Sequence, residues 1–151
     1  MVERFEQFSA LISTAYRLVQ KLEREEMEKY GLKGALAQYL LVMSHHPEGI
    51  TAAQLCDACD KDKAAVSRVI SEMEAKGLLV RLGEKEQAYR ALLMLTDAGK
   101  QAAAFVAERA SVAVVKANEG LSDAHRKIFY TALERIAANL QKICEDGIPE
   151  D

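Results

Sequence analysis

Residues 62–78 read DKAAVSRVISEMEAKGL, and this stretch decides the fold of the chain. Asp62 is a candidate N-cap and Gly77 a candidate C-terminal stop. Between them, apolar residues at three- and four-residue steps predict a helix with one buried face: Val66, Val69, Ile70 and Met73. The opposite face carries the small, hydroxyl and cationic side chains that contact phosphates and base edges of DNA: Lys63, Ala64, Ala65, Ser67, Arg68 and Ser71. Taken alone, this face suits an ordinary solvated helix about equally well.

The neighbouring segments shift that balance. Thr51 is a plausible N-cap for a short helix over 52–59, and two short helices joined by a tight turn form a helix-turn-helix. The segments LLVRL (78–82) and RALLMLT (90–96) have the composition of two strands, with the polar tip GEKEQAY between them. A hairpin that directly follows a helix-turn-helix is a wing.

Helices are predicted before this winged unit. Apolar residues from Phe5 to Leu22 recur at the spacing of one helical face, and Gly31 and Gly34 supply a stop. The segment ALAQYLLVMSHH (35–46) follows, and it is apolar on nearly all sides. A helix of that kind belongs in the middle of a core.

Long helices are also predicted after the wing. Thr96 or Asp97 can cap a helix that Gly120 ends, and Ser122 can cap a last helix that reaches about residue 145. The small winged unit could cover little of the apolar surface of these helices, so a second copy of the chain is expected to cover the remainder. The predicted fold is mainly α with a small β-wing. We expect one domain over 1–151, with a winged unit over 31–96 and dimerisation helices over 1–30 and 97–146.

Composition limits the classes of protein that remain. A chain of 151 residues with 50% hydrophobic content fits one domain with a real core. Apolar runs such as YLLVM at 39–43 are too short to span a membrane, and the N-terminal stretch lacks a signal-like apolar run, so a cytoplasmic protein is expected. No phosphate loop or nucleophilic triad is present, and no enzymatic activity or cofactor is predicted.

The order of these elements resembles the MarR family of bacterial winged-helix transcription regulators, over essentially the whole chain. Three motifs carry the resemblance: Asp-Lys-x-x-Val-Ser-Arg at 62–68, Glu-x-x-Gly-Leu-Leu-x-Arg at 74–81, and Leu-Thr-x-x-Gly-Lys at 95–100. The resemblance implies a homodimer that binds a pseudo-palindromic double-stranded DNA operator, usually repressing transcription until a small-molecule effector, an oxidant or a metal changes the dimer. Recognition helices would enter successive major grooves, with wings along the flanking DNA.

The resemblance also implies roles for individual residues. Lys63, Ser67 and Arg68 would touch phosphates or base edges, while Ala64 and Ala65 would approach bases without donating. The cations of the wing are Arg81, Lys85 and Arg90. The wing departs from the family, because Gln87 and Ala88 stand where many members carry an Asp-Arg pair, so weaker wing contacts are expected. From Ile50 to Thr96, seven Lys and Arg residues balance seven Asp and Glu residues, and this neutrality predicts a modest salt dependence.

Other sites are weighed against structural roles. Cys56 and Cys59 have the spacing of a redox or metal pair, but free cysteine also suits a small apolar contact between helices, which is the interpretation favoured here. Too few further Cys and His residues stand near them for zinc, so no metal site is predicted. In the family, effectors generally bind between the dimerisation helices and the winged unit, and the candidate lining residues are Tyr16, Arg17, Tyr39 and Met43. Two alternatives stay open: a winged-helix module that binds protein instead of DNA, and a thiol-redox switch at the cysteines.

Overall fold

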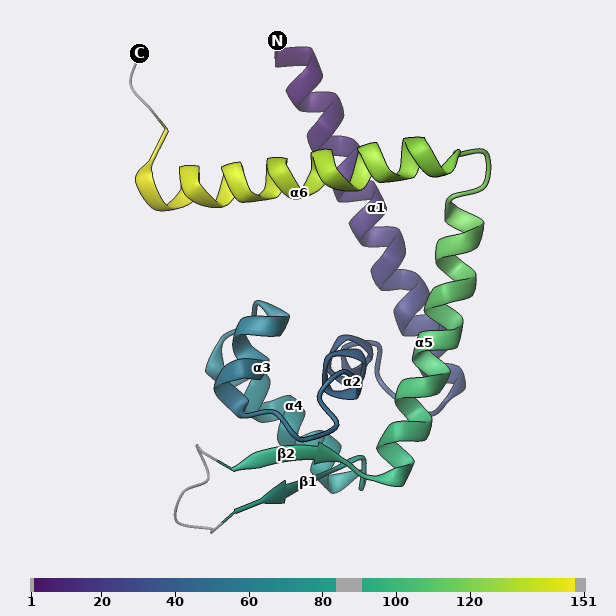
Figure 1. Ribbon diagram of the computed structural model, residues 1–151, viewed down its shortest axis with the longest axis vertical. Coiled ribbons are helices and arrows are strands. Elements are labelled where there is room, and N and C mark those ends of the chain that lie inside the picture. Colours follow the sequence, from purple (N-terminus) through teal and green to yellow (C-terminus); the bar gives the residue numbers. More distant parts are fainter. Residues whose placement is uncertain (1, 84–90, 149–151) are drawn as a thin grey trace. The chain divides into compact units, whose positions relative to one another are not determined.

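The computed structural model describes residues 2–83 and 91–148, and the described elements are those expected of a winged helix-turn-helix (Figure 1). The prediction of a mainly α fold with a small β-wing is confirmed. Lys85 and Arg90 lie outside the described residues, as do Gln87 and Ala88. In chain order the elements are α1 (Val2–Lys29), α2 (Leu36–Ser44), α3 (Ala52–Cys59), α4 (Lys63–Ala75), β1 (Leu79–Leu82), β2 (Leu92–Leu95), α5 (Asp97–Ala117) and α6 (Asp123–Asp146).

Side-chain caps set the ends of the short helices, as the sequence predicts. Thr51 accepts a hydrogen bond from the backbone N–H of Gln54, whose side chain accepts one in return from the Thr51 N–H, and this capping box begins α3. Asp62 caps α4 by accepting from the N–H of Ala65 at 2.8 Å. The turn between these helices is tight because Asp60 adopts a left-handed conformation with φ of 51°.

The chain forms two compact units, residues 1–110 and residues 111–151. The core of the first unit centres on α2, whose predicted central place is confirmed by the burial of five of its residues. Around α2 gather the inner faces of α3, α4 and the hairpin, with Met27 of α1 and three residues of α5. The side chains buried most completely are Met27, Leu36, Leu40, Ile50, Leu55, Cys59, Val66, Ile70, Met73, Leu79 and Leu93.

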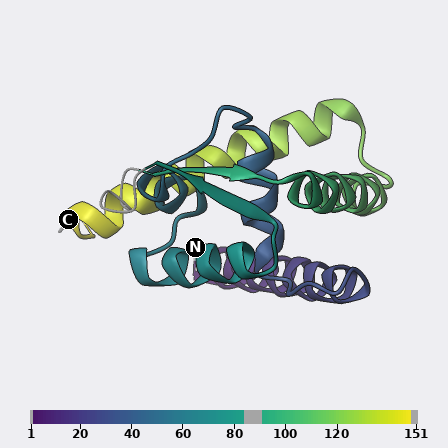
Figure 2. The same cartoon turned by 90° about the horizontal axis from the view of Figure 1, so that it is seen from below.

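The wing is anchored to the helix that follows it. Strands β1 and β2 are antiparallel, with Leu79 opposite Leu95 and Leu82 opposite Leu92. Strand β2 runs directly into α5 (Figure 2), and Thr96 caps that helix by accepting from the N–H of Gly99 at 3.1 Å. A side chain at Gly99 would place its Cβ 1.9 Å from the Leu78 carbonyl oxygen, so only glycine permits this close approach of α5 to the hairpin.

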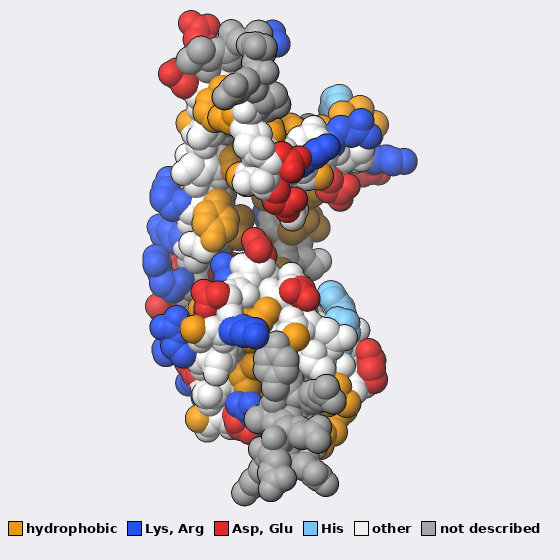
Figure 3. All heavy atoms as spheres, turned by 90° about the vertical axis from the view of Figure 1, so that its left-hand side faces the viewer, with side chains coloured by type: hydrophobic (Ala, Val, Ile, Leu, Met, Phe, Trp, Pro, Cys, Tyr) orange, Lys and Arg blue, Asp and Glu red, His pale blue; other side chains and the backbone are white. Residues whose placement is uncertain are grey.

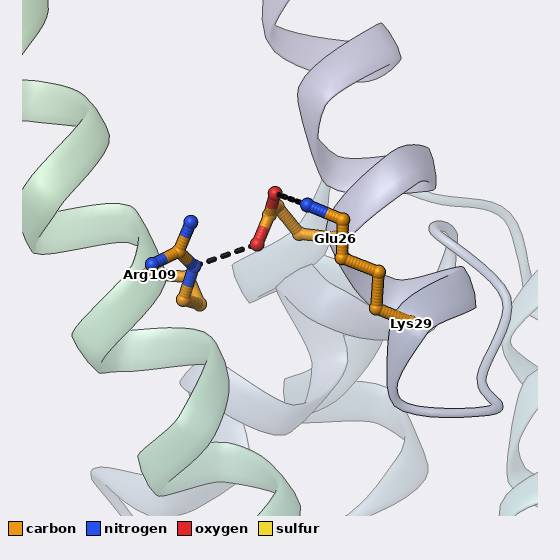
Figure 4. A network of polar contacts seen from close by, with 3 residues as sticks. All are labelled: Glu26, Lys29 and Arg109. Carbon is orange, nitrogen blue, oxygen red and sulfur yellow. Dashed lines mark hydrogen bonds and ion pairs between the residues drawn. The ribbon is translucent and has the colours of Figure 1, made fainter.

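The C-terminal end of α1 is held against α5 by charge and by ring stacking. Glu26 accepts hydrogen bonds from Lys29 and from Nε of Arg109, the latter at 2.6 Å (Figure 4). The rings of Tyr30 and Phe105 stack nearby with centroids 4.6 Å apart. In contrast, residues 3–22 of α1 are exposed, except for the half-buried Phe8. One end of α1 is therefore fixed in the first unit, and the other presents apolar side chains to solvent.

The second unit consists mainly of α6. Ser122 caps this helix, as predicted, by accepting from the N–H of His125 at 3.2 Å. None of the residues of α6, all of which the structure describes, is buried. Its apolar side chains lie exposed at helical spacing and include Phe129, Ile136, Leu140 and Ile143. Among the described helices, none has the length and apolar character required to cross a membrane.

Candidate nucleic-acid interface

The solvent face of α4 carries the side chains that the sequence singles out for DNA contact. Val66, Ile70 and Met73 are buried on the inner face, which fixes how the helix is rotated about its axis. As a result, the predicted contact residues share one outward face: Lys63, Ala64, Ser67, Arg68 and Ser71 are exposed and Ala65 is half-buried. Small side chains at 64, 65, 67 and 71 would let another molecule approach the helix backbone closely.

Arg68 is placed to donate hydrogen bonds outward. Its Nε donates to the carbonyl oxygen of Ala64 at 3.3 Å, one turn earlier on the same helix. Among the residues that the structure describes, no acidic side chain forms an ion pair with it. The charge of Arg68 also acts on the nearby Asp62 carboxyl. The hydrogen bond from the Ala65 N–H lowers the pKa of this carboxyl most, and the positive charge of Arg68 lowers it further. The terminal guanidinium nitrogens are thus left to meet an external acceptor.

Arg81, the wing cation that the structure describes, is less available to a ligand than Arg68. Arg81 on β1 donates from Nε to Glu74 of α4 at 3.0 Å, so any phosphate that binds Arg81 competes with this carboxylate. A second acid on α4, Glu72, pairs with Lys33 at 3.0 Å. The face drawn in Figure 3 shows several basic side chains along one edge, with acidic and further basic side chains scattered over the remainder. The electrostatic attraction for a polyanion is therefore local to a few side chains.

A shallow depression connects the start of α4 to the wing. It has a volume of about 370 Å³ and an apolar floor. Lys63 and Ser67 of α4 and Arg81 of β1 lie around it, together with Ala52, Ala53, Cys56, Val66 and Ile70. The structure brings these three predicted contact residues to one concave surface. Ala52 and Ala53 could not be predicted to line this depression from the sequence. Two alanines at the start of a helix carry no sign that they contribute to a binding surface.

An open cleft of about 670 Å³ lies between α1, α2 and α4. It brings together Tyr16 and Tyr39, two of the four candidate effector residues. Arg17 is exposed on α1 and Met43 is buried in the core, and neither lines the cleft. Residues that the sequence did not single out for an effector site also line it, among them the predicted DNA contacts Ala65 and Arg68. The others are Val19, Gln20, Glu23, Gly34, Ala35, Gln38, Leu41, Val42, His45, Lys61 and Val69.

A signal for part of this cleft exists in the sequence. The α1 residues that line it, Tyr16, Val19, Gln20 and Glu23, are spaced as one helical stripe. Such a stripe alone does not reveal which helix faces it, so the partners on α2 and α4 could not be found. Burial raises the pKa of Glu23 and of Tyr39, so the charged forms of both groups are disfavoured along the cleft.

The cysteines and histidines show no arrangement of a metal site within the described part of the chain. Cys59 is buried beside α4, Cys56 is half-buried, and Cys144 is exposed, all as free thiols. Burial raises the pKa of the Cys59 thiol, and this keeps it protonated. The Gln38 side chain on α2 donates to the Cys59 carbonyl oxygen at 3.4 Å, and this hydrogen bond joins the end of α3 to α2.

Comparisons with known proteins agree with this architecture. Residues 30–88 match a family model described as the MarR family. A Thauera aromatica protein described as a transcriptional regulatory protein for the hcr operon is 31% identical over 110 residues, which span 70% of this chain and 63% of that protein.

Solved structures share the fold over nearly the whole chain. A MarR family transcriptional regulator from Listeria monocytogenes, crystallised with 26mer DNA, superposes with a TM-score of 0.79 at 21% identity, covering 93% of this chain and 95% of its own. A MarR transcriptional regulator from Methanosarcina mazei Go1 gives a TM-score of 0.78 at 25% identity, covering 91% and 92%. Sequence motifs, fold and relatives converge, and the chain belongs to the MarR family.

Proposed function

We propose that the protein is a sequence-specific DNA-binding transcriptional regulator. It would act in the cytoplasm as a homodimer on a pseudo-palindromic operator, repressing transcription until a small molecule binds. The observation that carries this proposal is the exposed face of α4, where Arg68 has no ionic partner among the described residues and is flanked by small and hydroxyl side chains. The Listeria relative, which was crystallised with DNA, has the same fold. The protein would serve as a binding module without catalysis.

The homodimer is supported by apolar surface that the chain leaves exposed. Phe5 of α1 is 65% exposed and Ile128 of α6 is 66% exposed, and both helices carry further exposed apolar residues. Exposed apolar surface of this extent favours association, and a two-fold dimer is the commonest way to cover it. Two copies would present two α4 helices, as a palindromic site requires. The cleft beside α4 offers a place for an effector.

The proposal predicts that Arg68→Ala weakens specific DNA binding by about 1 to 3 kcal/mol. A guanidinium that donates to a base edge or a phosphate cannot be replaced by a methyl group. Fluorescence anisotropy with fragments from the DNA around the protein's own gene measures this effect. Arg17→Ala is the matched control, because it removes an exposed arginine of α1. Equal affinity of wild type and Arg68→Ala for every fragment would contradict DNA reading by α4.

A second candidate is a winged-helix module that binds another protein. It is favoured by the neutral charge of the winged unit and by the pairing of Arg81 with Glu74, which both weaken attraction for a polyanion. The same titration separates the two candidates through its salt dependence. Operator binding predicts affinity that falls as salt rises, with a modest slope because few phosphates are neutralised per subunit. An absence of DNA binding at low salt favours the protein-binding module.

A further inference from the structure

Helices α1 and α5 meet at two contacts that lie in register. Glu26 of α1 accepts a hydrogen bond from Nε of Arg109 at 2.6 Å (Figure 4), and the rings of Tyr30 and Phe105 stack with centroids 4.6 Å apart. On each helix the two residues stand four positions apart, so each pair lies on one stripe of its helix. Because residue 26 faces 109 and residue 30 faces 105, the helices run antiparallel at this point. We call these four residues the α1–α5 joint.

A buried apolar layer lies beside the joint. Met27 is 2% exposed and belongs to the same core cluster as Ala102, Ala103 and Val106 of α5. Among residues 3–29 Met27 alone is buried, and no residue among 107–117 is buried. Toward the N-terminal end of α1 and the C-terminal end of α5, the core therefore holds neither helix beyond the joint.

Glu26 is the polar connection between α1 and the rest of the first unit. Its Oε1 accepts from Lys29 of the same helix and its Oε2 accepts from Arg109, so both carboxylate oxygens are engaged. Within residues 2–83 and 91–148, the other α1 side chains that form hydrogen bonds or ion pairs do so inside α1, as Lys21 does with Glu25. Only 22% of the Glu26 side chain is exposed, so solvent screens its ion pair with Arg109 less than a fully exposed pair. The direction of α1 depends on few contacts, and this ion pair is the polar one.

Small changes at the joint have a large effect at the far end of α1. At about 1.5 Å per residue, the part of α1 before Glu26 extends about 36 Å. A tilt of about 5° at the joint moves the far end of such a rod by about 3 Å. This displacement is close to the rise of about 3.4 Å per base pair along DNA. A change of that size between two winged parts is enough to put one α4 helix out of register with its half-site.

We propose that the α1–α5 joint sets the separation of the two α4 helices in the homodimer, and with it the half-site spacing that the protein accepts. This inference rests on the proposed function and names the residues that give it spacing specificity. The exposed apolar residues of α1, such as Phe5 and Val19, would pack in the dimer, while the joint fixes how α1 leaves the winged part. Glu26 and Arg109 are positioning residues, because they act through the two helices that carry them. A dimer binds both half-sites only where their spacing matches that of its two α4 helices.

The first experiment measures the separation of the α4 helices in the full-length homodimer without DNA. Spin labels are attached to Lys76→Cys at the exposed end of α4, in a chain whose accessible thiols are removed by Cys56→Ala and Cys144→Ser. Double electron–electron resonance then gives the distribution of distances between the two labels. Arg109→Gln and Glu26→Gln should each shift or broaden this distribution by about 3 Å, the displacement expected from a tilt of about 5°.

Further variants separate positioning from stability. The double variant of Glu26→Gln with Arg109→Gln should behave like either single variant, because the same contact is lost in all three. Arg109→Lys keeps the charge and should restore part of the parent distribution. Lys21→Gln, which removes an ion pair inside α1, should leave the distribution unchanged.

A distance distribution that stays unaltered in both Arg109→Gln and Glu26→Gln overturns the inference, even if the Tm of both variants falls. Lower stability alone would assign the ion pair a merely structural role. Circular dichroism checks that each variant is folded. If Arg109→Gln is unfolded, Glu26→Gln provides the comparison, because it keeps the shape of the side chain and loses only its charge.

The second experiment measures spacing specificity. DNA duplexes that the wild type enriches from a random-sequence pool provide its preferred site, and one base pair is then inserted or deleted at the centre. Fluorescence anisotropy should show that this change weakens wild-type binding about tenfold or more, because one half-site moves out of register. In Arg109→Gln and Glu26→Gln the ratio should fall to about threefold or less, since α1 is then free to tilt. Lys21→Gln should keep the wild-type ratio, and equal ratios in the wild type and the two joint variants overturn the inference.

Failure of the proposed function gives a different pattern. If the wild type enriches no duplex while the label distances depend on Arg109 and Glu26, the joint stands as the determinant of α4 separation, and spacing specificity is overturned together with the proposed function. If the wild type sediments as a monomer, the inference and the homodimer are overturned together. If the wild type binds DNA and neither the distances nor the spacing ratio depends on the joint, the inference alone is overturned.

Discussion

Cys56 and Cys59 stand three residues apart on α3, yet their surroundings differ. Cys59 is 2% exposed and contributes to the core beside α4. Burial raises the pKa of its thiol, with Lys61 opposing that shift only in part. A thiol with a raised pKa stays protonated to higher pH, and thiolate is the reactive form. The Cys59 side chain thus serves as a small apolar residue of the core. In contrast, half-buried Cys56 lines the depression that Lys63 and Arg81 also line.

At this scale we predict unequal thiol reactivity. With the native protein near neutral pH, iodoacetamide should modify exposed Cys144 fastest, Cys56 more slowly and Cys59 only when the protein unfolds. Peptide mass spectrometry over a time course measures the three rates. A chain denatured in urea provides the control, since all three rates should then become similar.

The thiol-redox alternative makes the contrary prediction. If hydrogen peroxide reduces DNA affinity in the wild type but not in a Cys56→Ala, Cys59→Ala double variant, the structural role assigned to the pair is wrong. We expect the wild type and the variant to respond alike.

Helix α4 depends on its first turn, where Asp62 caps the backbone N–H of Ala65. This hydrogen bond, followed by the charge of Arg68, lowers the pKa of the Asp62 carboxyl below its ordinary value. A group whose pKa is lowered by folding stabilises the protein above its unfolded-state pKa. That contribution disappears as the pH falls through the folded-state pKa. The cap of α4 is therefore sensitive to acid below about pH 4.

The prediction at the scale of the element is that Asp62→Asn removes part of the acid sensitivity. Asparagine caps helices about as well as aspartate, so stability near neutral pH should change little. On acidification through the titration range of aspartate, the wild type should lose more of its free energy of unfolding than the variant. Urea denaturation followed by circular dichroism at several pH values measures the difference. Asp62→Ala is the control, because it lacks a capping side chain and should be less stable than Asp62→Asn at every pH.

An identical pH dependence in wild type and Asp62→Asn would show that the cap does not titrate as its geometry requires. In that case the acid sensitivity would belong to other carboxylates. Glu26 is the clearest of these, because hydrogen bonds from Lys29 and Arg109 lower its pKa in the same direction.

At the scale of the whole molecule, the winged part buries its apolar side chains, whereas α6 leaves its apolar side chains exposed. The winged part of the first unit has a continuous core, while α6 buries none of its residues. An isolated helix of 24 residues gains little stability from local interactions alone, so packing of its apolar face has to supply the rest. We therefore expect stability of the protein to depend on association of two copies.

The corresponding prediction is that Ile136→Glu, on the apolar face of α6, dissociates the homodimer. Sedimentation equilibrium should show a shift toward monomer, and the Tm of the wild type should rise with protein concentration whereas that of the variant should not. Thr131→Glu introduces the same charge at an exposed polar position on the other side of α6, and it should leave the assembly intact. A wild-type protein that sediments as a monomer at all concentrations would rule out the proposed homodimer.

The sequence by itself determined the order and the ends of the elements. Thr51, Asp62 and Ser122 are local signals, because each cap bonds to a backbone N–H three residues away. The rotation of α4 about its axis could also be predicted from the sequence, because the spacing of apolar residues within one helix decides which face is buried. The choice between Thr96 and Asp97 as the cap of α5 needed coordinates, because both side chains offer an acceptor in the right register.

Only the tertiary structure decided which distant side chains meet. Met43 is apolar on a helix that is apolar nearly all round, and its place in the core instead of the cleft depends on how α2 is turned against α1. The pairing of Arg81 with Glu74 and the place of Arg68 on the wall of the cleft arise where separate elements come together. Periodicity assigns a residue to a face of its own element, but the packing of the elements determines what that face opposes.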